Sequence, residues 1–149
     1  MVLYNTVMEI KDSKFLYVLT NIRQRLFTFL EKELAKENIT GIAPSDGDIL
    51  YVLDRKGTIT LQELARHTIK DKSTISSVVK KLEASGYVTK ERDVRDARRT
   101  NLRLTSEARR LRPVLFEISR RMNAKLFRGF TEEEKIILFT LIGKVYRNL

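Results

Sequence analysis

Between residues 72 and 81 of this sequence, small hydroxyl side chains are flanked by lysines, and several arginines follow shortly after them. Serine and threonine hydroxyls donate and accept hydrogen bonds, while lysine and arginine pair with phosphate oxygens. Residues 73–128 hold 15 Lys and Arg against 6 Asp and Glu, so nearly all of the net charge of +10 is local. A folded protein keeps such a block only where a bound anion or polyanion offsets the repulsion. The first candidate partner is therefore a nucleic acid.

The residue inventory argues against several other kinds of chemistry. The chain has no cysteine and one histidine, so disulfides, thiol redox chemistry and the usual Cys/His zinc sites lack their ligands. His67 cannot hold a transition metal alone. The densest acidic cluster, Glu132 to Glu134, follows Thr131 at an expected helix start, where negative charge favours the helix dipole. Without a nucleophile and base pair or a Gly-rich phosphate loop, we expect no catalysis, no metal and no cofactor.

Length and composition indicate one globular domain. The 149 residues are 42% hydrophobic, which is enough to bury a core. No apolar run approaches the length needed to cross a bilayer, and Lys11, Asp12 and Lys14 interrupt the N-terminus before a signal-peptide core can form. We therefore expect a single unit over residues 1–149, in the cytoplasm and with no membrane partner.

Three helices are predicted before the basic block. Between residues 13 and 36, apolar side chains recur every three or four positions, which predicts a long helix that either lines a core or packs against a second chain. Ser45 and Asp48 resemble a capping box at the start of a short second helix. Thr60 and Glu63 form a clearer box for a third, after the β-prone stretch Thr58 to Thr60.

The hydroxyl-rich segment is predicted to be a helix over Lys72 to Ser85, capped by Asp71 and ended by Gly86. At 100° per residue, its apolar side chains share one face: Ile75, Val78, Val79 and Leu82. The opposite face carries small hydroxyls and lysines: Ser73, Ser77 and Lys80, flanked by Thr74, Ser76 and Lys81. An ordinary solvated face would mix Glu and Lys, whereas short polar side chains let a helix approach a nucleic-acid groove closely.

Two strands are predicted next, over residues 87–93 and 100–105, as a two-stranded ribbon. The loop that joins them contains Arg95, Arg98 and Arg99. A plain solvated turn is the alternative, but hairpin tips usually contain Gly or Asn, and this tip has neither. The composition of the tip therefore favours a binding role for the arginines.

Two further helices complete the chain. Thr105 is expected to cap a helix that runs to about Arg128, with a kink or split near Arg112 because Pro113 lies inside it. The last helix, over residues 132–148, is apolar around most of its circumference and must be covered on more than one side. A second subunit is the simplest cover for a chain of this size.

This order of elements is that of a winged helix-turn-helix, and two sequence motifs resemble those of the MarR family of transcriptional regulators. The segment Lys72-Ser73-Thr74-Ile75-Ser76-Ser77-Val78-Val79-Lys80-Lys81-Leu82-Glu83, with Gly86 and Val88, is similar to the recognition helix of that family. The segment Asp93-Val94-Arg95-Asp96-Ala97-Arg98-Arg99, followed by Leu102-Arg103-Leu104-Thr105, is similar to its wing. The resemblance extends over essentially the whole chain.

The resemblance implies a mainly α fold with a small β wing. It implies a DNA-binding winged helix over residues 44–105 and dimerisation helices over 1–38 and 106–149. The protein would be a homodimer that binds double-stranded DNA at a pseudo-palindromic operator, usually as a repressor. A small aromatic ligand in a crevice between the two parts would release the DNA. Tyr17 and Tyr51 are candidates to line that crevice, and ordinary half-buried packing of the two tyrosines is the alternative.

The resemblance also implies roles for individual residues. From the recognition helix, base edges or phosphates would be contacted by Ser73, Thr74, Ser76 and Ser77, and phosphates by Lys72, Lys80 and Lys81. From the wing, Arg98, with Arg95 or Arg99, would enter the minor groove. Asp96 would brace the wing arginines. The chain departs from the family at Ser77, where a basic residue is common, so base preference does not carry over. It also departs at Ile69, where glycine is frequent, so the family's turn geometry does not carry over directly.

Three alternatives remain open at this point. A DNA-coating architectural protein needs basic charge but little sequence selection. An RNA-binding winged helix would use the same fold with a different partner. An enzyme acting on acidic substrates would need a catalytic constellation, for which the sequence gives no sign.

Overall fold

The computed structural model describes residues 14–93, 96 and 99–149. The predicted mainly α fold with a small β wing is confirmed. The elements, in chain order, are α1 (Phe15–Lys36), the 3-10 turn η2 (Pro44–Asp46), α2 (Gly47–Lys56), β1 (Ile59–Thr60), α3 (Leu61–His67), α4 (Lys72–Ala84), β2 (Val88–Arg92), β3 (Thr100–Leu104), α5 (Ser106–Arg110), α6 (Arg112–Leu126) and α7 (Glu132–Arg147).

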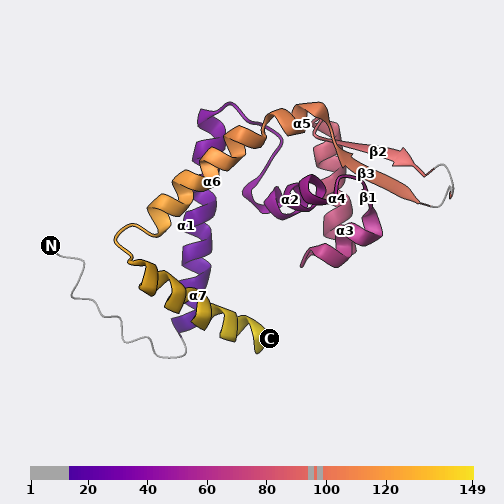
Figure 1. The fold of residues 1–149 in the computed structure, drawn as a ribbon. Coiled ribbons are helices and arrows are strands. Elements are labelled where there is room, and N and C mark those ends of the chain that lie inside the picture. Colours follow the sequence, from indigo (N-terminus) through magenta and orange to yellow (C-terminus); the bar gives the residue numbers. More distant parts are fainter. Residues whose placement is uncertain (1–13, 94–95, 97–98) are drawn as a thin grey trace.

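The elements form two parts, which Figure 1 shows side by side. One part contains α2, α3, α4, α5 and the three strands, and its tip is the loop between β2 and β3. Its core is made of aliphatic side chains that are almost completely buried, namely Ile49, Leu53, Leu64, Ile75, Val79, Leu82, Val88 and Leu102. The other part contains α1, α6 and α7, and α6 continues from α5 to connect the two.

The small sheet has three strands in the order β1-β3-β2, all antiparallel. The prediction of a two-stranded ribbon was therefore incomplete. Ile59 of β1 pairs with Leu102 of β3, and Val88 of β2 pairs with Leu104 of β3. The pairing of β1 ties the base of the wing to the start of α3, because α3 begins directly after β1.

Helix starts follow local capping signals in most cases. Thr60 accepts a hydrogen bond from the amide of Glu63, and Asp71, Thr105 and Thr131 cap α4, α5 and α7 as expected. The predicted box of Ser45 and Asp48 is wrong. The amide of Ala43 instead donates to Oδ2 of Asp46 at 2.7 Å. Pro44 suits the first position of a helical turn, so the turn begins there and Asp46 is the residue placed to reach back.

The predicted break near Arg112 is confirmed. α5 ends at Arg110, α6 begins at Arg112, and Leu111 lies between them. Pro113 occupies the first turn of α6, where a backbone N–H has no intrahelical acceptor, so proline costs nothing there. The break lets α5 pack on the sheet while α6 turns away along α1 (Figure 1).

A small second core joins α1 to α6 through Leu34, Ile39 and Ile118. Beside it, Arg121 forms an ion pair with the buried carboxylate of Glu33, with Nε 3.1 Å from Oε2. The same guanidinium donates to Glu37 at 2.9 Å. Arg121 of α6 therefore holds two acids of α1 at once.

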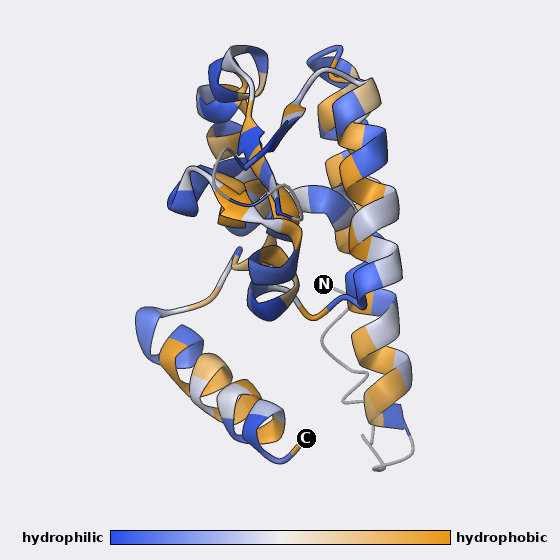
Figure 2. Ribbon diagram, turned by 90° about the vertical axis from the view of Figure 1, so that its right-hand side faces the viewer, coloured by the Kyte–Doolittle hydropathy of each residue, from blue (hydrophilic) through white to orange (hydrophobic). Residues whose placement is uncertain are grey.

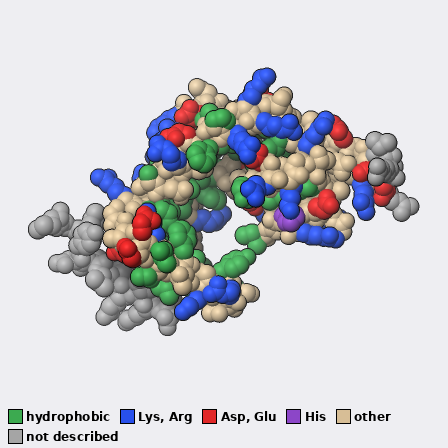
Figure 3. All heavy atoms as spheres, viewed as in Figure 1, with side chains coloured by type: hydrophobic (Ala, Val, Ile, Leu, Met, Phe, Trp, Pro, Cys, Tyr) green, Lys and Arg blue, Asp and Glu red, His purple; other side chains and the backbone are tan. Residues whose placement is uncertain are grey.

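The remaining apolar surface is exposed. α7 has no buried residue, although Ile136, Ile137, Phe139, Leu141, Ile142, Val145 and Tyr146 all lie on it. Figure 2 shows hydrophobic segments along α7 and along α1, and Figure 3 shows such side chains gathered on the surface over the same region. Among the described residues, no helix is both long and apolar enough to cross a membrane.

Candidate nucleic-acid interface

Helix α4 presents the two faces that its sequence predicts. Ile75, Val79 and Leu82 are fully buried in the core. On the opposite side, small hydroxyls and lysines are exposed to solvent: Lys72, Ser73, Thr74, Ser77 and Lys80, with Ser76 half-buried beside them. A helix face of short polar side chains fits the major groove of DNA, because no bulky group keeps the backbone away from the base edges.

The start of α4 is held by Asp71. Its Oδ1 accepts from the amide of Thr74 at 2.9 Å, and its Oδ2 accepts from the hydroxyl of Thr74 at 2.6 Å. These hydrogen bonds, first from the hydroxyl and then from the amide, lower the pKa of Asp71 below its ordinary value. The hydroxyl proton of Thr74 thus has an acceptor within the helix cap, so Thr74 meets a DNA partner only through its oxygen lone pairs or methyl group.

The three lysines of α4 have different surroundings. Lys72 and Lys80 are exposed and make no ion pair with another described residue. Lys81, in the last turn, forms an ion pair with Oδ2 of Asp46, whose side chain is 1% exposed. The contact between Lys81 and a phosphate thus stays a prediction, and the structure gives this ammonium an internal partner.

The ends of β2 and β3 at their connecting loop are joined by backbone and carboxylate contacts. The amide of Asp93 donates to the carbonyl oxygen of Arg99 at 3.0 Å, and the amide of Arg99 donates to that of Asp96 at 2.9 Å. Oδ2 of Asp96 lies 3.5 Å from Nε of Arg99, which is the pairing expected of a brace. Arg95 and Arg98 lie outside the described residues.

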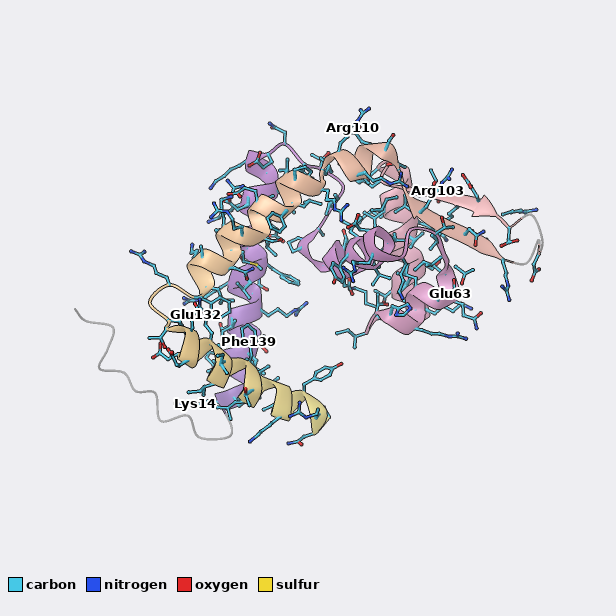
Figure 4. All side chains as sticks on the ribbon, in the orientation of Figure 1. Lys14, Glu63, Arg103, Arg110, Glu132 and Phe139 are labelled. Carbon is cyan, nitrogen blue, oxygen red and sulfur yellow. The ribbon has the colours of Figure 1, made fainter. Side chains whose placement is uncertain are left out.

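Cations along the strands of the wing are neutralised locally. Arg103 of β3 pairs with Glu91 of β2, and Lys90 pairs with Glu83 of α4 at 2.6 Å. Figure 4 shows Arg103 on the sheet and Glu63 on α3, both in the part of the molecule that contains α4. Among the described cations of α4 and of the strands, therefore, Lys72, Lys80 and Arg92 have no acidic partner.

A cleft of about 470 Å³ lies where α2 meets α1 and α6. Its lining is mostly apolar, and Tyr51, whose side chain is 64% exposed, forms part of its wall. Tyr17 does not line it, because it lies near the start of α1, far along the helix from the cleft residues Leu30 and Leu34. Oδ2 of Asp54 and Nη2 of Arg112, both at the cleft, are 3.1 Å apart.

Two features of the site could not be found by sequence reasoning. Asp46, which holds Lys81, lies 35 residues before it and carries no signal of that contact. Asp54 and Arg112, which join α2 to α6 at the cleft, are separated by 58 residues. Residues 14–93, 96 and 99–149 contain no group of three His, Cys, Asp or Glu side chains suited to a metal ion.

Comparison with known proteins agrees with this geometry. A sequence model of the MarR family matches residues 40–99. The uncharacterised HTH-type transcriptional regulator YcgE of Bacillus subtilis is 31% identical over 105 residues, which cover 70% of this chain and 68% of that protein.

Two solved structures share the fold. The organohalide-sensing regulator RdhR, in a form with bound 2,4-dichlorophenol, superposes with a TM-score of 0.83 at 23% identity, covering 99% of this chain and 89% of its own. A MarR variant from E. coli, complexed with operator DNA, superposes with a TM-score of 0.77 at 18% identity, covering 87% and 91%.

The matched relatives are transcriptional regulators and not enzymes. The winged helix, the exposed polar face of α4 and these relationships lead to one assignment. The chain belongs to the MarR family of winged helix-turn-helix, DNA-binding transcriptional regulators.

Proposed function

We propose that this regulator is a homodimeric repressor of a pseudo-palindromic DNA operator. Each subunit lays α4 in a major groove and extends its wing along the adjacent minor groove. The observation that carries this proposal is the exposed face of α4, where Ser73, Ser77 and Lys80 stand opposite a fully buried apolar face. A helix anchored so firmly on one side is preorganised to present the other side to a partner.

Division of labour within the interface follows from side-chain chemistry. The hydroxyls of Ser73, Ser76 and Ser77 are short and reach base edges, whereas the ammonium groups of Lys72 and Lys80 meet phosphates. The wing arginines enter a narrow A·T-rich minor groove, where negative potential is concentrated. The ion pairs of Lys90 and Arg103 support this role for the wing arginines, because they leave little unpaired positive charge on β2 and β3 themselves.

Dimerisation is supported by the apolar residues of α7 and of the first half of α1, which are left exposed by the described part of the chain. The part of the first proposed dimerisation segment before residue 14 lies outside the described residues. A symmetric dimer would present two copies of α4 to successive major grooves, about 34–36 Å apart.

Release by a small aromatic ligand is the second half of the proposal. The apolar cleft beside Tyr51 has a volume within the range of small-molecule sites, and it lies between the DNA-binding part and α6. Of its two arginines, Arg112 pairs with Asp54, whereas Arg55 has no acidic partner among the described residues and suits an acidic group on the ligand. RdhR, which binds 2,4-dichlorophenol in its solved structure, supports a ligand of this class.

The decisive experiment for DNA binding is selection of bound duplex fragments from the source genome, followed by affinity measurements. We expect one recurrent pseudo-palindrome, bound at least about a thousandfold more tightly than unrelated duplex of equal length. A ratio near one would instead favour the architectural protein, and stronger binding to RNA in competition would favour an RNA-binding winged helix.

The ligand is tested by adding salicylate and related aromatic acids to the complex with the selected operator. We expect operator release and a rise in thermal stability of the free protein, both reduced by Tyr51→Ala. Tyr17→Ala, outside the cleft, is the matched control and should leave both responses unchanged. No response to a broad panel would mean that the regulator acts without such a ligand.

A further inference from the structure

Both ends of the recognition helix are fastened to one short turn of the chain. Lys81, in the last turn of α4, pairs with Asp46, and Lys70, two residues before α4 begins, pairs with Asp48. Asp46 and Asp48 flank Gly47 at the start of α2. The segment from Asp46 to Asp48 thus receives an ammonium group from each end of α4.

The ion pair between Lys81 and Asp46 is constrained by the burial of the carboxylate and by a second hydrogen bond to it. The carboxylate is 1% exposed, and its Oδ2 accepts from the amide of Ala43 as well as from Lys81. Its Oδ1 is buried and has no hydrogen-bond partner among the described residues. A buried carboxylate that loses its only cation is left uncompensated, so the pair resists any shift of α4 that would separate the two groups.

The pair at Asp48 is less buried, with side-chain exposures of 22% for Lys70 and 35% for Asp48. It acts on the turn of the helix-turn-helix, just before the cap at Asp71. Together the two pairs fix both the position of α4 along its axis and its tilt against α2, which apolar packing alone restrains less sharply because it is non-directional.

We propose that Asp46 and Asp48 are positioning residues for the recognition helix, and that Lys70 and Lys81 serve DNA binding by holding these acids and not by contacting phosphate. This inference rests on the proposed entry of α4 into the major groove. The inference also links the cleft to α4, because Ala43, Pro44 and Gly47 of the same turn line the cleft wall. A change at the cleft wall is thereby passed to both ends of α4.

The direction in which Asp46→Asn changes operator affinity distinguishes a positioning role of Asp46 from a purely electrostatic one. Asp46→Asn removes a negative charge from a DNA-binding lobe, so charge alone would strengthen binding to any duplex. Positioning predicts that affinity for the selected operator falls by about tenfold, roughly the cost of one lost base contact, while affinity for unrelated duplex does not fall. Glu107→Gln, which removes an exposed acid from α5, is the matched control and should not lower the ratio.

Adjacent lysines of α4 supply a second matched pair. Lys80→Met should lower affinity for all sequences and reduce the slope of log affinity against log salt by about one unit. Lys81→Met should lower affinity for the operator alone and leave that slope unchanged, and Lys81→Arg should restore binding because it keeps the cation. The double variant with Asp46→Asn and Lys81→Met should lose less than the sum of the two single losses.

Thermal unfolding is measured for every variant, with binding compared below the lowest transition. If Asp46→Asn is unfolded there, Asp48→Asn, with its more exposed carboxylate, supplies the same comparison. An unchanged ratio of operator to unrelated affinity in the acid variants, or an equal loss of salt slope in Lys80→Met and Lys81→Met, would overturn the inference. If the unmodified protein does not discriminate between duplexes, the proposed function itself fails, whatever the variants do.

Discussion

One arginine of the loop between β2 and β3, Arg99, is braced by an acid. Arg99 is paired with Asp96 at 3.5 Å, and the backbone around it closes on Asp93. Arg98, its neighbour, lies outside the described residues, and the sequence assigns it to the minor groove.

Arg98→Ala tests that assignment. We predict that binding to an operator with A·T flanks weakens by about 1–3 kcal/mol, because an inserted guanidinium gains most where a narrow groove concentrates negative potential. The measurement compares affinities for otherwise identical operators with A·T and G·C flanks. The loss should be smaller with G·C flanks, and an unchanged affinity for both would remove the wing from the mechanism.

Residue identity alone predicts which side chains face outward, but not which of them are already engaged. The 100° period separates Ser73, Ser77 and Lys80 from the buried face correctly, because it is a local property of the helix. Whether a lysine is available for phosphate depends on acids elsewhere in the chain. Lys80 and Lys81 are neighbouring residues of the same type, and only the fold shows that Asp46 pairs with Lys81.

At the scale of elements, the contact between α1 and α6 depends on ionised carboxylates. The hydrogen bond from Lys36 and the charge of Arg121 hold the pKa of Glu33 below its ordinary value of 4.5, against the opposing effect of burial. A carboxyl group with a lowered pKa in the folded state stabilises the fold fully above its ordinary pKa. That contribution is lost as the pH falls through the lowered value.

Glu33→Gln should therefore reduce the thermal midpoint at neutral pH, because it leaves the half-buried Arg121 without the charge of its buried partner. The difference from the unmodified protein should shrink as the pH falls from the ordinary value of 4.5 through the lowered pKa of Glu33, where the folded protein takes up the proton. Glu31→Gln, at an exposed position of the same helix, is the control. A difference that stays constant over the whole acid range would contradict an ionic role for Glu33.

Local signals predicted most element boundaries, and the errors occur where distant segments decide. Caps at Thr60, Asp71, Thr105 and Thr131 were predicted because a cap depends on residues three positions apart. The pairing of β1 with β3 was missed, since it joins residues 59 and 102 and β1 has two residues. The start of α2 was misplaced because Pro44 begins a 3-10 turn before it, and Asp46 rather than Ser45 or Asp48 makes the capping hydrogen bond.

At the scale of the molecule, the DNA-binding part has a complete core and the α1, α6 and α7 part does not. Twelve buried side chains form the first core, whereas three form the second. Apolar residues on α7 and on the first half of α1 are exposed and belong to neither core. A second copy of the chain would cover them, and the same contact would set the spacing of the two recognition helices.

Ile142→Glu tests this arrangement at the centre of the apolar side of α7, where Leu138 and Val145 lie on the same face. Ile142 is 48% exposed in the single chain, so a charge there is tolerable in a monomer but would be buried without a partner in a dimer. We predict a shift from dimer to monomer in sedimentation, with operator affinity that becomes strongly dependent on protein concentration. Thr140→Glu adds the same charge on the polar side, near Lys144 and Arg147, and should remain dimeric. A dimeric Ile142→Glu variant with undiminished operator affinity would show that α7 lies outside the subunit interface.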